Sequence, residues 1–233
     1  MSAAGLRVGG LAPFTSIDYP GKLSAVVFVQ GCPWRCGYCH NPHLQARGAA
    51  TGPAWAETLA WLQRRVGLLD AVVFSGGEPT IDPALGAAMD EARALGLAIG
   101  LHSGGIHPRR LREVLPRADW IGLDVKAPLD DDTLHDRITG VAGSAAAARE
   151  GLDAVLDANI AHEARSTVHP ALFDEAALLR LAEGLARRGV KRYAVQIARP
   201  AGALRAVAPP GWPSAGTLGR LGAMFEGFEL RGG

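Results

Sequence analysis

The residues best suited to do chemistry are three cysteines within eight positions, and they are the only cysteines in the chain. Cys32, Cys36 and Cys39 have the spacing C-x3-C-x2-C and directly follow the apolar run 23–29. Thiolates this close in sequence can converge on one metal centre. A cubane iron–sulfur cluster normally takes four cysteines, so three ligands would leave one iron open to a substrate or cofactor.

The spacing alone leaves other sites open. Cys36 and Cys39 are also spaced as in a thioredoxin-like redox pair. A zinc site with three cysteines and one histidine could use His40 or His43 as its fourth ligand. The sequence around the loop therefore does not by itself decide between a cluster, a zinc ion and a dithiol.

A second motif follows the apolar run 70–75, which leads into Gly76-Gly77-Glu78. Two glycines at the end of a strand allow a ligand to approach the backbone closely. The carboxylate of Glu78 could hold an ammonium group through charge-assisted hydrogen bonds. An ordinary glycine turn between a strand and a helix is the alternative interpretation.

These motifs must be positioned by elements that alternate along the chain. Strands are expected at the apolar runs 24–30, 70–75, 97–102, 119–126, 161–168 and 193–198. Helices are expected near 54–66, 83–95, 108–115, 144–158, 173–188 and 215–225. Such alternation predicts parallel strands in βα units, as an open doubly wound sheet or as a partial barrel.

Side-chain alternation within the strands favours the barrel. A doubly wound sheet is apolar on both faces, whereas here one face of several strands is small or polar. The clearest case is the fourth run, in which one face carries Ile121, Leu123 and Val125 and the other carries Gly122, Asp124 and Lys126. We therefore expect an α/β fold, a partial (βα)6 barrel with a polar interior, although strands with one wet face would give the same pattern. The cysteine loop, the Gly-Gly-Glu motif, His102 and the segment 124–126 all fall at predicted carboxyl ends of strands, where βα barrels form active sites.

The two motifs together resemble the radical S-adenosylmethionine (SAM) superfamily, including the aromatic Tyr38 just before the last cysteine. The resemblance implies that the three cysteines bind a [4Fe–4S] cluster whose fourth iron is chelated by SAM. It also implies that Gly76, Gly77 and Glu78 hold the methionyl ammonium, that Tyr38 packs near the adenine, and that the fold is a complete or partial barrel.

A narrower resemblance covers nearly the whole chain. The segments 13–22 and 38–42 are similar to those of glycyl-radical-enzyme activases, and most similar to the activating proteins of anaerobic (class III) ribonucleoside-triphosphate reductase. This implies a glycyl radical enzyme as protein substrate and a flavodoxin-like electron donor. Two alternatives stay open within the superfamily: an activase of the pyruvate formate-lyase type, and an enzyme acting on a small molecule, as 7-carboxy-7-deazaguanine synthases do.

Other positions are assigned through the resemblance. Asp124, Lys126 and Arg165 are expected to contact the polar parts of SAM, and Asp18 and His40 are expected to contact the glycine-bearing peptide. Physically, the two cations could neutralise a carboxylate and Asp124 could accept from hydroxyls. An internal barrel salt bridge is the alternative for these three residues.

The chain departs from the resemblance at the end of the third predicted strand. Related activases often carry Asp-Thr-Asn-Gly there, whereas this chain carries His-Ser-Gly-Gly from His102. His102 could hydrogen-bond SAM in its neutral form, or it could be a satisfied interior histidine.

Composition limits the other possibilities. Lys plus Arg number 24 against 23 Asp plus Glu, so no basic excess indicates nucleic acid. The first ten residues lack the apolar run of a signal peptide, and no stretch is apolar enough to span a membrane. Clustered unpaired cysteines favour a cytoplasmic location. We expect a lead-in at 1–22, the barrel at 23–200 with a cluster loop at 31–43, and a C-terminal loop and helix at 201–233. The long loop 200–216 could serve as a lid or a docking loop.

Overall fold

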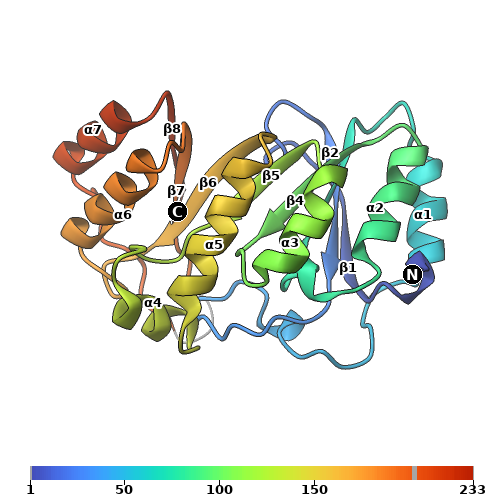
Figure 1. Ribbon diagram of the computed structural model, residues 1–233, viewed down its shortest axis with the longest axis horizontal. Coiled ribbons are helices and arrows are strands. Elements are labelled where there is room, and N and C mark those ends of the chain that lie inside the picture. The colour runs from blue at the N-terminus through green and yellow to red at the C-terminus, as the bar shows by residue number, and fades with distance from the viewer. Residues whose placement is uncertain (1, 201–203, 233) are drawn as a thin grey trace.

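The apolar runs of the sequence fold into one curved sheet that carries helices on its outer face (Figure 1). The computed structural model describes residues 2–200 and 204–232. Within these residues the strands are β1 (Val8–Thr15), β2 (Ser24–Val29), β3 (Ala71–Gly76), β4 (Ala98–Ser103), β5 (Trp120–Asp124), β6 (Ala161–Val168), β7 (Arg192–Ile197) and β8 (Gly227–Arg231). The α-helices are α1 (Trp55–Gln63), α2 (Leu85–Ala94), α3 (Pro108–Val114), α4 (Asp132–Thr139), α5 (Ser144–Asp157), α6 (Glu175–Arg187) and α7 (Ala215–Met224). Short 3₁₀ helices are η1 (Ala3–Gly5), η2 (Pro42–Leu44), η3 (Pro79–Ile81) and η4 (Leu115–Arg117).

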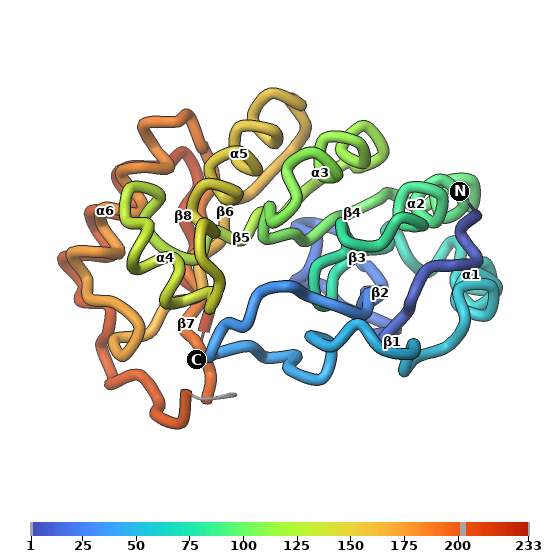
Figure 2. The backbone as a smooth tube through the Cα atoms, turned by 60° about the horizontal axis from the view of Figure 1, so that its bottom comes forward, coloured from blue at the N-terminus to red at the C-terminus, as the bar shows by residue number. Residues whose placement is uncertain are grey.

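The strands follow one another in the sheet in the order of the chain, from β1 to β8. Strand β1 runs antiparallel to β2, and every later pair is parallel. Figure 2 shows the sheet curving into an arc with helices outside it. Because β1 and β8 do not pair, the barrel is partial, and the expected α/β barrel class is confirmed.

The two faces of the sheet have different contents, as the alternation predicted. The outer face packs against the helices in one large core that includes Ile121, Leu123 and Val125, each at most 2% exposed. The inner face holds only a small apolar cluster near the strand starts, built around Tyr19 stacked on Trp120 with ring centroids 5.1 Å apart. The rest of the interior, toward the carboxyl ends, is therefore left for polar groups.

Strands β2 to β7 match the six predicted strands, and the six predicted helices all form. Pro108 occupies the first turn of α3, as expected for a residue with a fixed φ and no N–H, whereas α2 begins only at Leu85, after Pro83.

Among the strands and α-helices, β1, β8 and α4 were not predicted. Strand β1 contains two glycines and Pro13, which have low strand propensity, and it forms because it can pair with the edge of β2. Helix α4 is short and polar, and it depends on local signals instead. The Asp131 side chain caps its first turn, and Gly140 ends it at φ 69°.

The segment 200–216, predicted as a lid or docking loop, includes residues 201–203, which lie outside the described residues.

Candidate active site at the carboxyl ends of the strands

A cavity of about 190 Å³ opens at the carboxyl ends of the strands, inside the arc of the sheet. Its walls come from the loop after β2, the ends of β3, β4 and β5, and side chains of β6 and β7. Most residues that the sequence singled out line it: Cys32, Cys36, Tyr38, Cys39, His40, Gly76, Gly77, Glu78, His102, Asp124 and Lys126. Arg165 and Asp18 do not line it, but both contact residues that do.

The cysteine loop is held in place through its backbone. The N–H of Gly31 donates to the carbonyl of Leu44 at 2.7 Å, and the N–H of Cys32 donates to that of Gln45 at 3.0 Å. Further along, the N–H of Arg35 donates to Thr139, the last residue of α4, at 2.7 Å. The loop therefore has a defined shape that does not depend on side-chain contacts of the three cysteines.

The three thiols are half-buried and unpaired, and no disulfide joins them. Burial, together with the charge of Glu78, raises the pKa of the Cys32 thiol to about 12, and burial also raises the pKa of Cys36. Reactive redox thiols have a lowered pKa, whereas the pKa of Cys36, one of the two cysteines of the thioredoxin-like alternative, is raised. Metal binding at this loop would have to displace thiol protons.

The placement of the thiols tests which metal centre fits. Across residues 2–200 and 204–232, no three His, Cys, Asp or Glu side chains gather closely enough to bind a single metal ion. A four-iron cluster spreads its thiolates over separate irons of a larger core. Three thiols arranged around one cavity therefore fit a cluster better than they fit the zinc site that the spacing left open.

The two glycines of the second motif are required by the close approach of β2 and of the loop that follows it. Gly76 has φ 118°, and a Cβ there would collide with the backbone of Val29. A Cβ on Gly77 would collide with the carbonyl of Gly31. That same carbonyl accepts the N–H of Glu78 at 2.8 Å. Close packing of the two loops is thus a structural reason for the glycines, beside the ligand approach expected from the sequence.

The Glu78 carboxylate, only 1% exposed, ties two loops together. Its Oε1 accepts from the Thr80 N–H at 3.1 Å, the Thr80 hydroxyl at 2.6 Å and the Ser103 hydroxyl at 2.8 Å. Its Oε2 accepts from the Gly104 N–H at 2.9 Å. A carboxylate oxygen can accept more than one hydrogen bond, so Oε2 keeps capacity for a donor in the cavity. The roles of Thr80 and Ser103 were not predicted, although Thr80 lies two positions after Glu78 and Ser103 directly follows His102.

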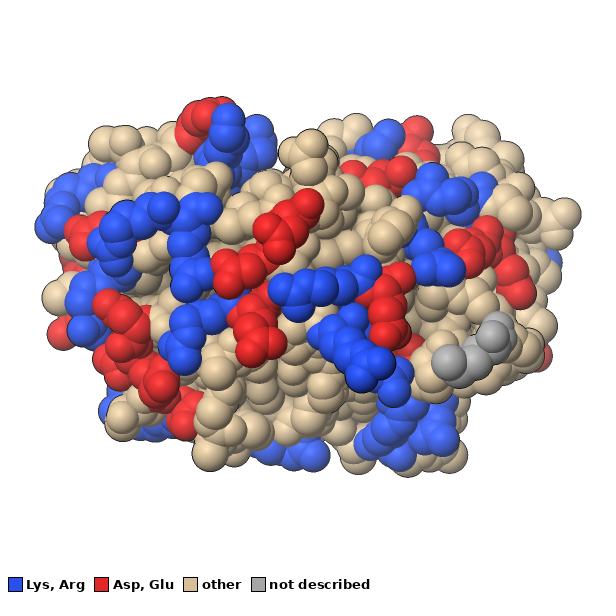
Figure 3. Space-filling view, in the orientation of Figure 1, with Lys and Arg blue, Asp and Glu red and all other residues tan. Residues whose placement is uncertain are grey.

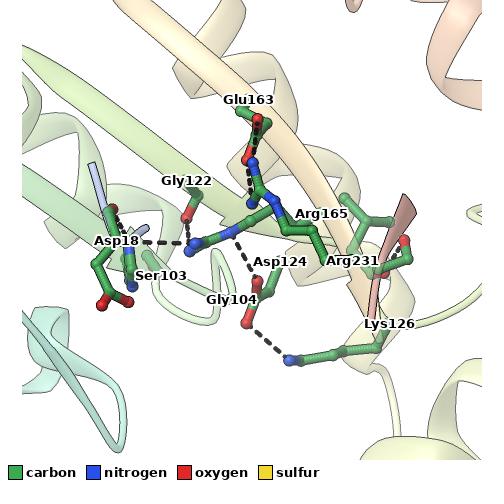
Figure 4. Close-up of polar contacts among 12 residues, drawn as sticks. Asp18, Ser103, Gly104, Gly122, Asp124, Lys126, Glu163, Arg165 and Arg231 are labelled. Carbon is green, nitrogen blue, oxygen red and sulfur yellow. Dashed lines mark hydrogen bonds and ion pairs between the residues drawn. The ribbon is translucent and has the colours of Figure 1, made fainter. Parts of the chain in front are cut away.

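A compact charge cluster lies on β5 and β6 (Figure 4). Asp124 accepts from the Lys126 ammonium at 2.9 Å and pairs with the Arg165 guanidinium at 3.4 Å. Burial alone would raise the pKa of Asp124, but the two cations outweigh it and lower that pKa to about 2. The cluster therefore carries one negative and two positive charges, and its excess positive charge suits an anionic group in the cavity.

Gly122 makes room for this cluster. A Cβ there would lie 2.5 Å from Cζ of Arg165, so any larger residue would displace the guanidinium. The Gly122 carbonyl also accepts from Arg165 Nη2 at 3.3 Å. The small residue on the inner face of the strand thus positions the arginine.

His102 joins the lead-in segment to the barrel interior. Its Nε2 lies 2.8 Å from the carbonyl of Asp18 and 3.2 Å from Nη1 of Arg165. The shorter contact to a carbonyl assigns the proton to Nε2, which leaves Nδ1 as an acceptor. Burial and the charge of Arg165 lower the pKa of His102 to about 3, so the ring is neutral. In the described residues Nδ1 has no hydrogen-bond partner, and it could accept from a ligand hydroxyl or ammonium.

A second buried ion pair was not predicted from the sequence. Arg231 on β8 donates to both oxygens of Glu163 on β6, at 2.8 and 2.9 Å (Figure 4). Glu163 is 3% exposed, and the bidentate geometry is the strongest form of such a pair. The contact ties the last strand to the barrel interior across β7.

The two expected peptide contacts lie on the open side of the barrel. His40 is exposed as a whole residue. Partial burial of its ring, together with the charge of the nearby Arg199, lowers its pKa. Asp18 is half-buried, and its carboxylate accepts from the Thr15 hydroxyl at 2.7 Å. Next to them a second cavity of about 630 Å³ lies between residues 16–20 and the ends of β7 and β8. Gln196 lines both cavities, so this opening, which we call the lateral opening, adjoins the site.

Comparison with known families decides the class of this site. The Radical SAM superfamily matches residues 26–195, which is most of the chain. The chain belongs to the radical SAM superfamily. Its members use a [4Fe–4S] cluster and SAM, and the matched range contains the cysteine loop, the Gly-Gly-Glu motif and the charge cluster.

Several curated relatives of this radical SAM protein are named for glycyl radical enzymes. One from Methanocaldococcus jannaschii, named a glycyl-radical enzyme activating enzyme, is 33% identical over 128 residues, which is 53% of this chain and 51% of the relative. The pyruvate formate-lyase-activating enzyme of Clostridium pasteurianum is 31% identical over 131 residues, 54% of each chain. The chain thus spans about half the length of these relatives.

Solved structures support the fold of this radical SAM protein. Streptococcus suis SuiB bound to S-adenosylmethionine matches with a TM-score of 0.65 and 12% identity, covering 88% of this chain and 48% of that one. QueE from Escherichia coli matches with a TM-score of 0.52 and 18% identity, covering 82% and 84%. At these identities the likeness concerns the fold alone. Within the described ranges, no helix combines the length and apolar character needed to cross a membrane.

Proposed function

We propose that this protein activates a glycyl radical enzyme, and that its protein substrate is an anaerobic, class III ribonucleoside-triphosphate reductase. The observation that carries the activase assignment is the identity of about a third, over more than a hundred residues, to a relative named for glycyl-radical enzyme activation. The reductase is the finer part of the proposal, and it rests on the lead-in segment 13–22 and the Tyr-Cys-His-Asn-Pro segment 38–42.

In this proposal Cys32, Cys36 and Cys39 hold the [4Fe–4S] cluster. When bound and reduced by one electron, this group would supply the reductive cleavage of SAM to methionine and a 5′-deoxyadenosyl radical, and that radical would take a hydrogen atom from a glycine Cα. The electron comes from a flavodoxin-like donor. Unpaired thiols suit the reducing cytoplasm, where we place the protein.

The described side chains have suitable partners for each end of SAM. Oε2 of Glu78 can accept from the methionyl ammonium, because it has only one donor in the structure. Lys126 and Arg165 carry two positive charges against the one negative charge of Asp124, so the cluster favours binding of the methionyl carboxylate. Tyr38 lines the cavity with its ring 5.9 Å from the Lys126 ammonium, and it offers an apolar surface for the adenine.

The lateral opening supports a protein substrate. It adjoins the cavity through Gln196 and is lined by Ile17, Pro20 and Leu230 as well as by polar groups. Ile17 and Leu230 are 76% and 43% exposed. A backbone glycine carried on a loop of a partner enzyme can approach such an open side, with Asp18 and His40 at its edge.

Pyruvate formate-lyase is the second candidate substrate, because the names of several relatives specify it. These relatives share about half of their length with this chain. A direct comparison of the two partner enzymes is therefore the informative experiment.

The test is anaerobic reconstitution with iron and sulfide, reduction with dithionite, and addition of SAM with either partner enzyme. We expect 5′-deoxyadenosine and a glycyl-radical EPR signal on the reductase. A reductase with its radical glycine changed to alanine, and a Cys36→Ala variant of this protein, should both give no radical. A signal only on pyruvate formate-lyase would assign the second substrate. SAM cleavage with no radical on either enzyme would indicate a small molecule. No cluster and no cleavage would end the radical proposal altogether.

A further inference from the structure

The proposed function requires an electron from outside these 233 residues. Each SAM cleavage consumes one electron, and all three cysteines of the chain are assigned to a single cluster. These 233 residues therefore offer no cysteines for a second cluster that could relay the electron. The donor must approach the cysteine loop from the protein surface.

The cysteine loop has one buried side and one exposed side. Trp34 and Tyr38 point inward and are 3% and 4% exposed. Pro33, Arg35 and Gly37 alternate with them and are exposed. A donor that reaches the loop from solvent therefore meets the side that carries Arg35.

Charge is distributed unevenly around this loop. The whole chain has 24 basic and 23 acidic residues, but residues 1–56 contain a single acidic residue, Asp18. The same stretch contains four basic residues: Arg7, Lys22, Arg35 and Arg47. The part of the chain that supplies the cysteine loop is thus locally basic in an otherwise balanced protein.

The three arginines of this stretch lie beside the cysteine loop and are positioned by contacts with the backbone. The Cβ and Cγ of Arg47 lie 3.2 Å from the site of a Cβ on Gly31, the residue before Cys32. Arg7 Nη1 donates to the carbonyl of Arg47 at 3.4 Å and to that of Gly48 at 3.3 Å. Arg35 Nη1 donates to the carbonyls of Cys32 and Trp34. We call Arg7, Arg35 and Arg47 the arginine surface.

Little negative charge offsets this surface. Arg47 pairs with Asp82 at 3.6 Å, and in the described ranges neither Arg7 nor Arg35 pairs with a carboxylate. The Asp82 side chain is 1% exposed, so its charge is not available to a partner protein. Segment 30–50 runs along the lower edge of the molecule in Figure 1 and across the front in Figure 2. Figure 3, in the orientation of Figure 1, shows Lys and Arg side chains gathered at the lower right of this face.

We propose that the arginine surface docks an acidic electron-carrier protein, which gives up one electron for each SAM cleaved. The inference rests on the proposed function, since only a reductive reaction needs such a partner. Charge complementarity is the argument: an acidic carrier is drawn to unneutralised guanidinium groups, and its redox group then faces the exposed side of the cysteine loop. Exposed charges act over about 8 Å at physiological salt, so the attraction acts on a carrier that is already close to this surface.

The test uses the reconstituted protein, an acidic FMN-containing flavodoxin as the probe, and the variants Arg7→Glu and Arg47→Gln. The control is Arg220→Glu, an exposed arginine of α7 that pairs with Glu183 at 3.4 Å. Binding of the flavodoxin is measured directly at several salt concentrations. In parallel, 5′-deoxyadenosine formation is measured with reduced flavodoxin and with dithionite.

We expect each arginine-surface variant to weaken flavodoxin binding, by about tenfold for Arg7→Glu at low salt, with a shallower salt dependence. The flavodoxin-driven rate should fall in parallel, while the dithionite-driven rate and the iron content stay at wild-type values. Arg220→Glu should match the wild type throughout.

Unchanged flavodoxin binding in both variants would overturn the inference. So would variants that keep flavodoxin binding but no longer form the glycyl radical with dithionite, because the surface would then belong to the substrate enzyme. Failure of the wild type to cleave SAM with dithionite would refute the proposed function separately. The binding measurement would still decide the docking surface.

Discussion

At the scale of single residues, the site is built from groups that each serve more than one neighbour. Glu78 accepts four hydrogen bonds from two loops and is also one of the residues that line the cavity. His102 bonds the lead-in segment through one nitrogen and leaves the other for a ligand. Conservative changes at these two positions should therefore have measurable effects on stability as well as on SAM binding.

Glu78→Gln should destabilise the protein and weaken SAM binding. The glutamine amide group would face either the Thr80 N–H or the Gly104 N–H, so one buried backbone donor would lose its acceptor. We expect a cost of about 1–3 kcal/mol in the free energy of unfolding. Chemical denaturation and SAM binding measure the two effects.

Glu57→Gln is the matched control, because Glu57 is exposed and accepts a single bond from Ala54 at 3.2 Å. Its effect should stay within about 0.5 kcal/mol. Equal stability changes in the two variants would contradict the linking role of Glu78.

His102 should make stability depend on pH in a defined direction. Its folded pKa, about 3, lies below the ordinary histidine pKa of 6.5 that applies in the unfolded chain. Between these values the unfolded chain binds a proton that the folded protein does not, so stability falls as the pH drops below about 6.5. A glutamine at this position can donate to the Asp18 carbonyl but does not titrate.

The prediction is that the wild type loses stability relative to His102→Gln as the pH falls from 7 to 5. Denaturant unfolding of the cluster-free proteins across this range provides the measurement. If the stabilities of the wild type and of His102→Gln changed with pH in the same way, His102 would have the same pKa in the folded and unfolded states, which would contradict the prediction. His135, whose pKa burial lowers to about 4, contributes equally to both proteins and cancels.

At the scale of elements, the inner face of each strand decides what the cavity can hold. Strand β5 alternates Ile121 and Leu123 outward with Gly122 and Asp124 inward, and the glycine leaves space for Arg165. The alternation was visible in the sequence, but the contact between β5 and β6 side chains depends on their register.

Gly122→Ala should weaken SAM binding by about tenfold, which corresponds to about 1.4 kcal/mol. The added methyl group collides with the Arg165 guanidinium and moves it away from Asp124. Gly184→Ala is the control, since nothing lies within 4 Å of its Cβ position in α6. It should stabilise the helix by up to about 1 kcal/mol and leave SAM binding unchanged. If Gly122→Ala bound SAM as the wild type does, the assignment of Arg165 to the proposed SAM site would be wrong.

At the scale of the whole molecule, the open edge of the barrel is held by its last strand. Strand β8 pairs only with β7, and the buried Arg231–Glu163 pair ties it to β6. This strand also borders the lateral opening, so its position shapes the side on which the partner enzyme is proposed to approach.

Arg231→Ala should destabilise the protein by about 3–5 kcal/mol, because it leaves the Glu163 carboxylate buried without a partner. The double variant Arg231→Ala/Glu163→Gln should recover part of this loss, since the buried charge is also removed. Denaturant unfolding of the single and double variants measures the difference. A single variant as stable as the wild type would mean that water replaces the arginine.

Some features of the fold and of the site could be predicted from the sequence, and others could not. The three cysteines, the glycine pair and the polar strand faces could be found because they lie in contiguous segments with a regular period. This was enough to expect the radical SAM superfamily and a partial barrel, and the family match and the fold confirmed both. Strands β1 and β8 were missed because their residues have low strand propensity or are charged, and they form only where a neighbouring strand offers hydrogen bonds.

The sequence by itself determined the chemistry of the site, because thiol, carboxylate and guanidinium groups are properties of residue types and spacing. Only the tertiary structure decided how those groups are shared. Thr80 and Ser103 bond Glu78, Asp18 bonds His102, and Arg231 bonds Glu163 across 68 positions of the chain. Such contacts depend on the register and curvature of the sheet, which no local pattern contains. The same reason explains the arginine surface, in which Arg7 reaches the backbone of Arg47 only after β1 has paired with β2.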